Sequence, residues 1–504
     1  MSSDTKRDSQ FHVLLGLFIF AGLILRVIGL FYFPTGMEGD EVHVVYWGRQ
    51  WIQSKQWLLI DVGDLPAWET PSAYIFGGLD LVGINPRWGA VAISFLELAM
   101  CYLWTARRSD KQTALMATAF LSLMPWHFFF SYVLGPCVAG FWTSLYLLDI
   151  KNPLGRVLGN MGGLLYYVSY RVLLVWGGLV NLYRRQWKTL GIDILSGLVT
   201  LAVLAMFGGN HLKGFFAKGS YLVSTREPIE WVYHYLNSFI LWWMPPLQVW
   251  WEQLSEYSAG DVGFGFAHSL GFQTPLSLGT SLFFGWGLYI SYKDKKYRDL
   301  LGLFVLSLVC VGFGPSFVHF PFILPVVAFL AAIAASRALQ KNKRNRVLVI
   351  MSLVLSVASL VVVISNLGHS DKWRTFTSKT ELIPSAVRAE IGTTSFVWTA
   401  GADLARATLA ADRADLSVFG FSTSFLNWVN EITREAYAKK TPWVFIQNTP
   451  APVHPRPKVI QEMQVFKEDF DSRIKFFEAN VSVSSKKTIV VDGVEIGILY
   501  EIVY

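Results

Sequence analysis

The chain has 504 residues, of which 53 % are apolar, 15 % are aromatic and 16 % are charged. This balance excludes an ordinary soluble enzyme and indicates a polytopic α-helical membrane protein. The net charge is +7, but the basic residues form short clusters between apolar runs, so we interpret them as topology signals and expect no nucleic-acid partner. The three cysteines, Cys101, Cys137 and Cys310, lie far apart in or beside apolar stretches, which favours inert core thiols over disulfides or a metal site.

Apolar runs long enough to cross a membrane recur along the chain, and we predict about 11 transmembrane helices. They are expected at residues 11–31, 88–105, 112–130, 133–149, 158–169, 171–183, 189–207, 272–291, 299–315, 320–338 and 347–366. With the N-terminus in the cytoplasm, the basic clusters from Lys6 to Arg346 all fall on the cytoplasmic side, as the positive-inside rule requires. The first span carries Arg26 and has no cleavage-site pattern, so we interpret it as an uncleaved span.

This topology leaves three segments outside the membrane: residues 32–87, residues 208–271 and everything after about 367. The first two are rich in Trp and Tyr, which predicts interfacial helices at the headgroup level. We expect a transmembrane domain over residues 1–369 and a soluble extracytoplasmic domain over residues 370–504. The protein is expected in a membrane, with a prokaryotic cytoplasmic membrane as the favoured location.

The soluble domain is expected to have an α/β fold. Its apolar patterns predict strands at residues 395–399, 442–447, 487–491 and 496–503 and helices near 401–411 and 428–439. The Asp492-Gly493 pair is typical of a tight hairpin turn. With about 135 residues, the domain is long enough to bury its own core.

Three carboxylates, Glu38, Asp40 and Glu41, follow directly after the first predicted span. Asp40 follows Gly39 and precedes a helical pattern, so its simplest interpretation is a helix N-cap. An ionisable cluster at the rim of a membrane is, however, a functional hypothesis by default. We therefore select Asp40 and Glu41 as candidate catalytic residues.

Residues 40–51, Asp-Glu-Val-His-Val-Val-Tyr-Trp-Gly-Arg-Gln-Trp, resemble the Asp-Glu loop of the GT-C integral-membrane glycosyltransferases. The resemblance is to the protein-mannosyltransferase and aminoarabinose-transferase branch, glycosyltransferase family 39. Further stretches match in order and spacing at residues 68–74, 85–88, 124–131, 163–171 and 315–325. Together they cover roughly residues 10–340, and their order carries more weight than any single motif.

The chain also departs from this pattern. The family usually has Arg after the position of Ser131, where this chain has Tyr132, and a polar residue of the family is replaced within residues 135–137. The first outer loop contains no Asp-x-Asp, which argues against the metal-dependent oligosaccharyltransferase branch. A divalent metal is therefore neither required nor excluded by the pattern, and no metal site is assigned.

The resemblance implies the GT-C fold and an inverting transfer of a sugar from a polyprenyl-phosphate donor to an acceptor hydroxyl on the outer face. Asp40 would act as the base that takes the hydroxyl proton, and Glu41 would orient the acceptor or a sugar hydroxyl, although the two could exchange roles. The donor phosphate and lipid would be bound by cationic and hydrogen-bonding groups. The residues implied are Arg171, Tyr167, His319 and Arg49.

Three of these four phosphate contacts have a simpler interpretation. Arg171 could snorkel to the headgroups, His319 could line a loop, and Arg49 could pair with Glu41 or a membrane lipid. No cofactor is implied beyond the lipid-linked sugar, which is a co-substrate. The expected partners are membrane lipids, the polyprenyl-phosphate sugar and an acceptor that is a protein, a lipid or a glycan.

Two other classes stay open. A non-catalytic scaffold of the same fold could dock a membrane-complex partner through its C-terminal domain, which the replacement at Tyr132 favours. A transporter is the second, but transporters usually show matched inverted repeats with charged or Gly/Pro-broken spans at mid-membrane, and the spans here carry few such charges.

Overall fold

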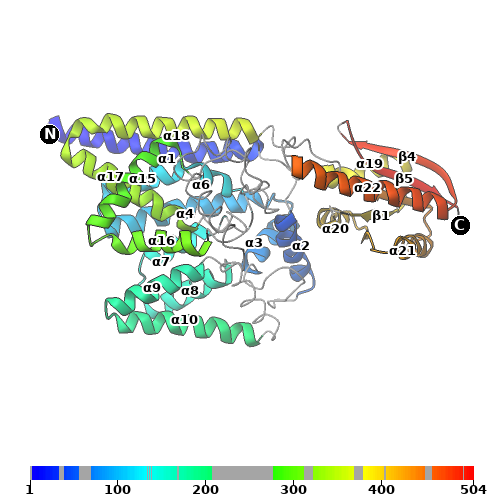
Figure 1. Ribbon diagram of the computed structural model, residues 1–504, viewed down its shortest axis with the longest axis horizontal. Helices are drawn as coiled ribbons and strands as arrows, with labels where there is room; N and C mark the ends of the chain where they lie inside the picture. The colour runs from blue at the N-terminus through cyan, green and yellow to red at the C-terminus, as the bar shows by residue number, and fades with distance from the viewer. Residues whose placement is uncertain are drawn as a thin grey trace. The chain divides into compact units, whose positions relative to one another are not determined.

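The computed structural model describes residues 3–32, 39–55, 70–132, 134, 137, 139–166, 170–206, 276–311, 322–367, 379–401, 404–448, 457–491 and 493–503. The chain divides into two compact units, residues 1–33 with 44–367 and residues 34–43 with 368–504. In the described residues, the first unit is helical and the second contains a five-stranded sheet (Figure 1). The division of the chain into a glycosyltransferase-like and a soluble domain stays a prediction.

Apolar helices of different lengths build the first unit. They are α1 (Ser3–Tyr32), α4 (Arg87–Arg108), α5 (Lys111–Ser122), α6 (Pro125–Phe130), α7 (Ala139–Leu147), α8 (Pro153–Tyr166), α9 (Tyr170–Tyr183), α10 (Trp187–Met206), α15 (Leu278–Lys293), α16 (Arg298–Val311), α17 (Leu324–Lys341) and α18 (Arg346–Leu367). Among the described helices, α1, α4, α10 and α17 are long and apolar enough to cross a membrane. The number of about 11 spans stays a prediction.

The span predicted over residues 112–130 is not one helix. It is broken between α5 and α6 at Leu123 and Met124. Met124 is extended, with ψ of 125°, and Pro125 opens α6. A residue before proline is pushed out of the helical region, and proline is well tolerated at the first helical position, so Pro125 ends one helix and starts another.

Helix α17 lies at the centre of the first unit. It packs against α5 and α15, and almost all of its side chains are buried. The outward faces of other helices instead expose large apolar side chains, among them Leu17 of α1, Leu198 of α10 and Val354 of α18. An apolar outer surface around a buried centre is the distribution that a lipid environment requires. Cys101 and Cys137 are buried free thiols, as expected, whereas the side chain of Cys310 lies outside the described residues.

Two short helices, α2 (Gly39–Gln53) and α3 (Thr70–Leu81), lie in the first predicted outer loop. Their position at the membrane interface stays a prediction. The second predicted outer loop, residues 208–271, lies outside the described residues.

The sheet of the second unit has the strand order β2-β1-β3-β5-β4. Its strands are β1 (Val397–Ala400), β2 (Val418–Gly420), β3 (Trp443–Gln447), β4 (Val483–Val491) and β5 (Val494–Ile502). Strand β1 is parallel to β2 and β3, whereas β3–β5 and β4–β5 are antiparallel. Strands β4 and β5 meet at the pair Val491 and Val494, and the φ of +74° at Gly493 explains why glycine suits this predicted hairpin.

Helices cover both faces of this sheet. They are α19 (Lys379–Ile391), α20 (Leu404–Arg413), α21 (Phe425–Ala438) and α22 (Pro457–Asn480). Side chains of α19 and α20 share one apolar core with Phe445 and Leu499, whereas those of α21 and α22 share another with Ile446 and Tyr500. Successive residues of β3 and β5 thus feed opposite cores, as the alternation of a strand requires.

An ion pair at the edge of the second core gives a pH-dependent prediction. Glu478 of α22 accepts hydrogen bonds from Lys486 Nζ at 2.6 Å and Tyr500 Oη at 2.8 Å. The hydrogen bond from Lys486 lowers the pKa of Glu478. A lowered carboxyl pKa stabilises the fold above the unfolded value of about 4.3, and that contribution is lost as the pH falls through the folded value.

We therefore expect Glu478→Gln to lower the local opening free energy of β5 by less than about 1 kcal/mol at pH 7, because the pair is partly solvated. Once the pH falls below the lowered folded pKa of Glu478, the variant and the natural chain should become equal. Hydrogen exchange of β5 amides in the full chain, corrected for intrinsic rates, measures this. Glu431→Gln on the exposed side of α21 serves as the control, and a difference that persists at low pH would contradict the assignment.

Candidate active site

Helix α2 carries the predicted catalytic pair in its first turn. The helix begins at Gly39, so Asp40 lies inside it rather than before it as a separate cap. Carboxylates in a first turn interact favourably with the helix dipole. The side chain of Glu41 is fully buried, while the side chain of Asp40 lies outside the described residues.

The backbones of α2 and α3 are in direct contact where they cross. A Cβ atom at Gly48 would lie 1.8 Å from the carbonyl oxygen of Ala73, and one at Gly77 would lie 2.4 Å from the carbonyl carbon of Gly48. Only glycine permits an approach this close. The rings of Trp51 and Tyr74 pack beside the crossing with centroids 5.4 Å apart. The last turns of α2 are thereby held against α3.

An ion pair also joins these two helices. Arg49 Nη1 donates to Asp80 Oδ2 at 2.7 Å, and each side chain is 10 % exposed. Arg49 was expected to contact the donor phosphate, a role that stays a prediction, and the ion pair gives it an anchoring role in addition. Asp80 was missed from the sequence. The feature that could have identified it is that Asp80 is the single carboxylate in the otherwise apolar stretch 73–81.

A double-mutant cycle tests this anchor. Removing one partner of a buried ion pair costs about 3–5 kcal/mol, because a charge is left uncompensated. We therefore expect Arg49→Met and Asp80→Asn each to lower the apparent melting temperature, and the double variant to lose less than their sum. The exposed pair of Arg337 and Asp294, with side chains 44 % and 31 % exposed, is the control and should contribute less than about 1 kcal/mol. Additive effects at Arg49 and Asp80 would contradict the anchor.

The predicted phosphate ligands belong to other segments. Arg171 lies in the first turn of α9 and is half-buried, whereas Tyr167 and His319 lie outside the described residues. The residue before Arg171, which was not selected from the sequence, fixes this end of α9. The Tyr170 hydroxyl donates to Asn160 Oδ1 at 2.9 Å, and a Cβ atom at Gly163 would lie 2.4 Å from the Tyr170 ring.

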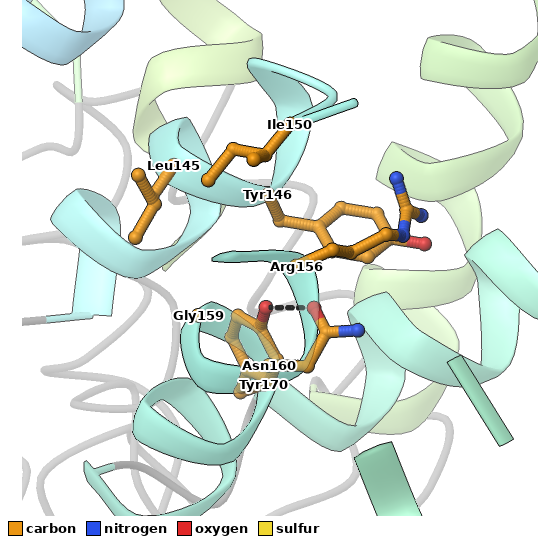
Figure 2. A pocket seen from close by; sticks show the side chains of 7 residues that line it. All are labelled: Leu145, Tyr146, Ile150, Arg156, Gly159, Asn160 and Tyr170. Atoms are coloured by element: carbon orange, nitrogen blue, oxygen red, sulfur yellow. Dashed lines mark hydrogen bonds between the residues drawn. The ribbon is translucent and has the colours of Figure 1, made fainter. Parts of the chain in front are cut away.

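A recess around these residues is shown in Figure 2, where Arg156, Asn160 and Tyr170 line it beside Tyr146. Its volume is about 10 Å³, the space of at most one water molecule. Arg156 binds both carboxylate oxygens of Asp193, at 2.7 and 3.0 Å. This recess is therefore a polar contact between helices and does not have the size of a sugar or lipid-phosphate site.

A larger cavity of about 160 Å³ lies nearby, lined in part by α9 and α16. Arg108 Nη2 binds Asp299 at 2.6 and 2.7 Å, and Arg184 Nη2 lies 3.4 Å from the same carboxylate. These cations are engaged with a protein carboxylate, so the cavity is not assigned to the donor phosphate. Among the residues that the structure describes, no group of three or more His, Cys, Asp or Glu side chains is placed to hold a metal ion.

The residue that replaces the family's usual Arg has a structural role. Tyr132 is fully buried, and its hydroxyl donates to the carbonyl oxygen of Arg26 at 2.7 Å. The ring packs edge to face on Phe128 at 5.3 Å between centroids. This position therefore holds a buried phenol, not a cation that faces a ligand.

No protein-family model matches the sequence, and no curated protein matches it. Solved structures share its fold. The crystal structure of ArnT from Cupriavidus metallidurans bound to undecaprenyl phosphate has a TM-score of 0.54 and 12 % identity, covering 97 % of this chain and 98 % of that one. The oligosaccharyltransferase of Archaeoglobus fulgidus in complex with Zn and sulfate has a TM-score of 0.53 and 11 % identity, covering 86 % and 67 %.

A third similar structure is the Archaeoglobus fulgidus oligosaccharyltransferase AglB in complex with an inhibitory peptide and a dolichol-phosphate. Its TM-score is 0.52 at 10 % identity, with 88 % of this chain and 70 % of that chain covered. At these identities the likeness establishes the fold. The chain has the GT-C fold, as its resemblance to that superfamily implied.

Proposed function

We propose that this protein is an inverting glycosyltransferase of the membrane. It moves a sugar from a polyprenyl-phosphate donor to an acceptor hydroxyl on the outer face. The observation that carries the proposal is the fold, shared over 97 % of the chain with ArnT bound to undecaprenyl phosphate. The Asp40-Glu41 pair at the start of α2 supplies the chemistry that such a transfer needs.

Asp40 is proposed as the general base. An acceptor hydroxyl is a weak nucleophile until its proton is taken in the transition state, which a positioned carboxylate can do. A single displacement with inversion needs one base and room for the acceptor, not the second carboxylate of a retaining hydrolase. Glu41 is buried, which suits a group that orients the substrate or α2 itself rather than one that exchanges protons with water.

The departing lipid phosphate needs stabilisation of its negative charge. Arg171 is the leading candidate, because an arginine near the start of α9 can donate a fork of hydrogen bonds to phosphate oxygens. Tyr167 and His319 are proposed as further ligands of the phosphate. Arg49 is engaged with Asp80, so we assign it first to holding α2 and only second to the phosphate.

The test is direct. Purified protein in detergent or liposomes is incubated with labelled polyprenyl-phosphate sugars, and transfer to an acceptor or slow hydrolysis is followed. We expect release of the lipid phosphate with inversion at the anomeric carbon. The proposal would be overturned if neither reaction occurs with hexose or pentose donors although thermal denaturation shows that the protein is folded.

A non-catalytic scaffold of the same fold is the second candidate. The buried, hydrogen-bonded Tyr132 favours it, since a family cation is missing at that position. In that case an Asp40→Asn variant would support normal cell growth or envelope structure wherever loss of the whole protein does not. A scaffold would have no protein, lipid or glycan acceptor. Its C-terminal domain would instead bind a partner in a membrane complex.

A further inference from the structure

Three ionisable side chains are buried together inside the helical unit. They are Arg26 of α1, Glu97 of α4 and His127 of α6, with exposed fractions of 0 %, 3 % and 4 %. Burial of charge within membrane helices is costly unless the charges compensate each other, and it usually marks a functional element. None of the three is among the residues proposed for the chemistry.

The contacts fix how the three side chains are joined. Arg26 Nη2 lies 2.5 Å from His127 Nδ1. A guanidinium can only donate, so Nδ1 accepts and the ring carries its proton on Nε2. His127 Nε2 lies 3.2 Å from Glu97 Oε1, but these two atoms are not aligned as a hydrogen bond. The contact between the ring and the carboxylate is therefore electrostatic.

Arg26 also binds the backbone of its own helix and the two residues that flank α6, Ser122 and Tyr132. Its Nη1 donates to the carbonyl oxygens of Gly22 and Ser122, at 2.9 and 2.5 Å, and its own carbonyl oxygen accepts from Tyr132. Glu97 lies against α7, since a Cβ atom at Gly140 would come within 1.9 Å of Glu97 Oε1. The positive and negative charges thus sit on separate helices, with one neutral ring between them.

The two charged helices are the stems of one loop. Helix α1 ends at Tyr32 and α4 begins at Arg87, and between them lies the segment that contains α2 and α3. Arg26 is six residues from the end of α1 and Glu97 is ten residues from the start of α4. At 1.5 Å per residue these side chains lie roughly 9 and 15 Å along the helices from the loop.

We propose that Arg26, His127 and Glu97 form a positioning relay that sets the separation of these two stems. His127 couples the charge on α1 to the charge on α4, so that the loop carrying Asp40 and Glu41 starts and ends at fixed points. The structural part of this inference is independent of any reaction. Its consequence for catalysis rests on the proposed function.

Two replacements of His127 distinguish the proposed positioning relay from simple packing of the ring. The amide of His127→Gln can accept from Arg26 and donate toward Glu97, whereas His127→Phe keeps a ring but neither donates nor accepts. Spin labels at Tyr32→Cys and Ala92→Cys, in a background without native cysteines, report the stem separation by dipolar broadening. We expect a broadened distribution of separations in His127→Phe and a distribution close to that of the natural chain in His127→Gln.

A double-mutant cycle on the two charged side chains, here called the charge cycle, provides the second measurement. Arg26→Met and Glu97→Gln should each lower the apparent melting temperature, and the double variant should fall by less than the sum of the two shifts, although the two side chains are joined only through the ring. The control is the directly paired Arg156 and Asp193, whose neutralisation should lower the melting temperature without changing the stem distances. Additive shifts, or equal stem distributions in His127→Phe and the natural chain, would overturn the relay.

Kinetics then test the catalytic consequence. If the natural chain transfers sugar, His127→Phe is expected to lower kcat at least about tenfold while KM for the donor changes less than about threefold, because the base is displaced but the lipid site is kept. Restoration of kcat in His127→Gln supports positioning, and unchanged kcat in His127→Phe refutes it. A natural chain without activity refutes the proposed function alone, since the label distances and the charge cycle still decide the relay.

Discussion

Replacement of Asp40 by asparagine is expected to slow sugar transfer strongly while the protein stays folded. The amide keeps the size of the side chain but cannot take a proton from the acceptor. General-base catalysis contributes about 100- to 10,000-fold, so the residual rate should fall by at least about 100-fold. Initial rates with a labelled polyprenyl-phosphate sugar measure the effect, with thermal denaturation as the check on folding.

The matched control is Glu38→Gln, which removes a neighbouring carboxylate two residues away that lies before the family-like pattern. Its rate should stay within about twofold of the natural chain, since it takes no part in proton transfer. Loss of activity in both variants would mean that transfer requires the negative charge of this segment and not one specific base. Full activity in Asp40→Asn would remove Asp40 from the role of base and make Glu41 the next candidate.

A second large effect is expected at one of two adjacent glycines of α3. A Cβ atom at Gly77 would meet the backbone of Gly48 at 2.4 Å, whereas one at Gly78 would meet only Ile52 Cδ1 at 3.5 Å. Gly77→Ala should therefore destabilise the α2–α3 contact by about 1–3 kcal/mol or more, the cost of overpacking. Gly78→Ala should be neutral or stabilising by up to about 1 kcal/mol, because alanine is the better helix former.

The same pair of variants tests whether the crossing supports the site. Gly77→Ala should lose most sugar transfer as α2 is displaced, and Gly78→Ala should keep it. Transfer rates and melting temperatures of the two variants, measured side by side, decide the matter. Similar behaviour at the two positions would mean that the helices do not approach each other as closely as the structure shows.

Local patterns in the sequence were enough to predict many of the elements. The Asp492-Gly493 pair predicted a hairpin, and β4 and β5 meet around Gly493. Strand β2 was missed because its three residues, 418–420, are too few to show alternation. Helix α22 was missed as well, since much of it is charged and its apolar stripe is narrow.

The pairing of distant side chains could not be predicted. Arg49 and Asp80 are 31 residues apart, and Arg26 and His127 are 101 residues apart. A single charge in an apolar run shows that a partner is needed, but many partners satisfy that need equally well. Arg49 was accordingly linked to Glu41, a lipid or the donor, while Asp80 was overlooked. Only the packing of helices selects one partner among them.

The burial of α17 has a consequence for how the protein enters the membrane. This helix has the least apolar window of the four candidate spans, yet it is the most buried. It is rich in alanine and meets α15 so closely that a Cβ atom at Gly287 would lie 2.1 Å from the carbonyl oxygen of Leu330. Small residues favour helix contacts in lipid but contribute little to the insertion of an isolated segment. Stable insertion of α17 during biosynthesis is therefore expected to depend on neighbours such as α15 that have already entered the bilayer.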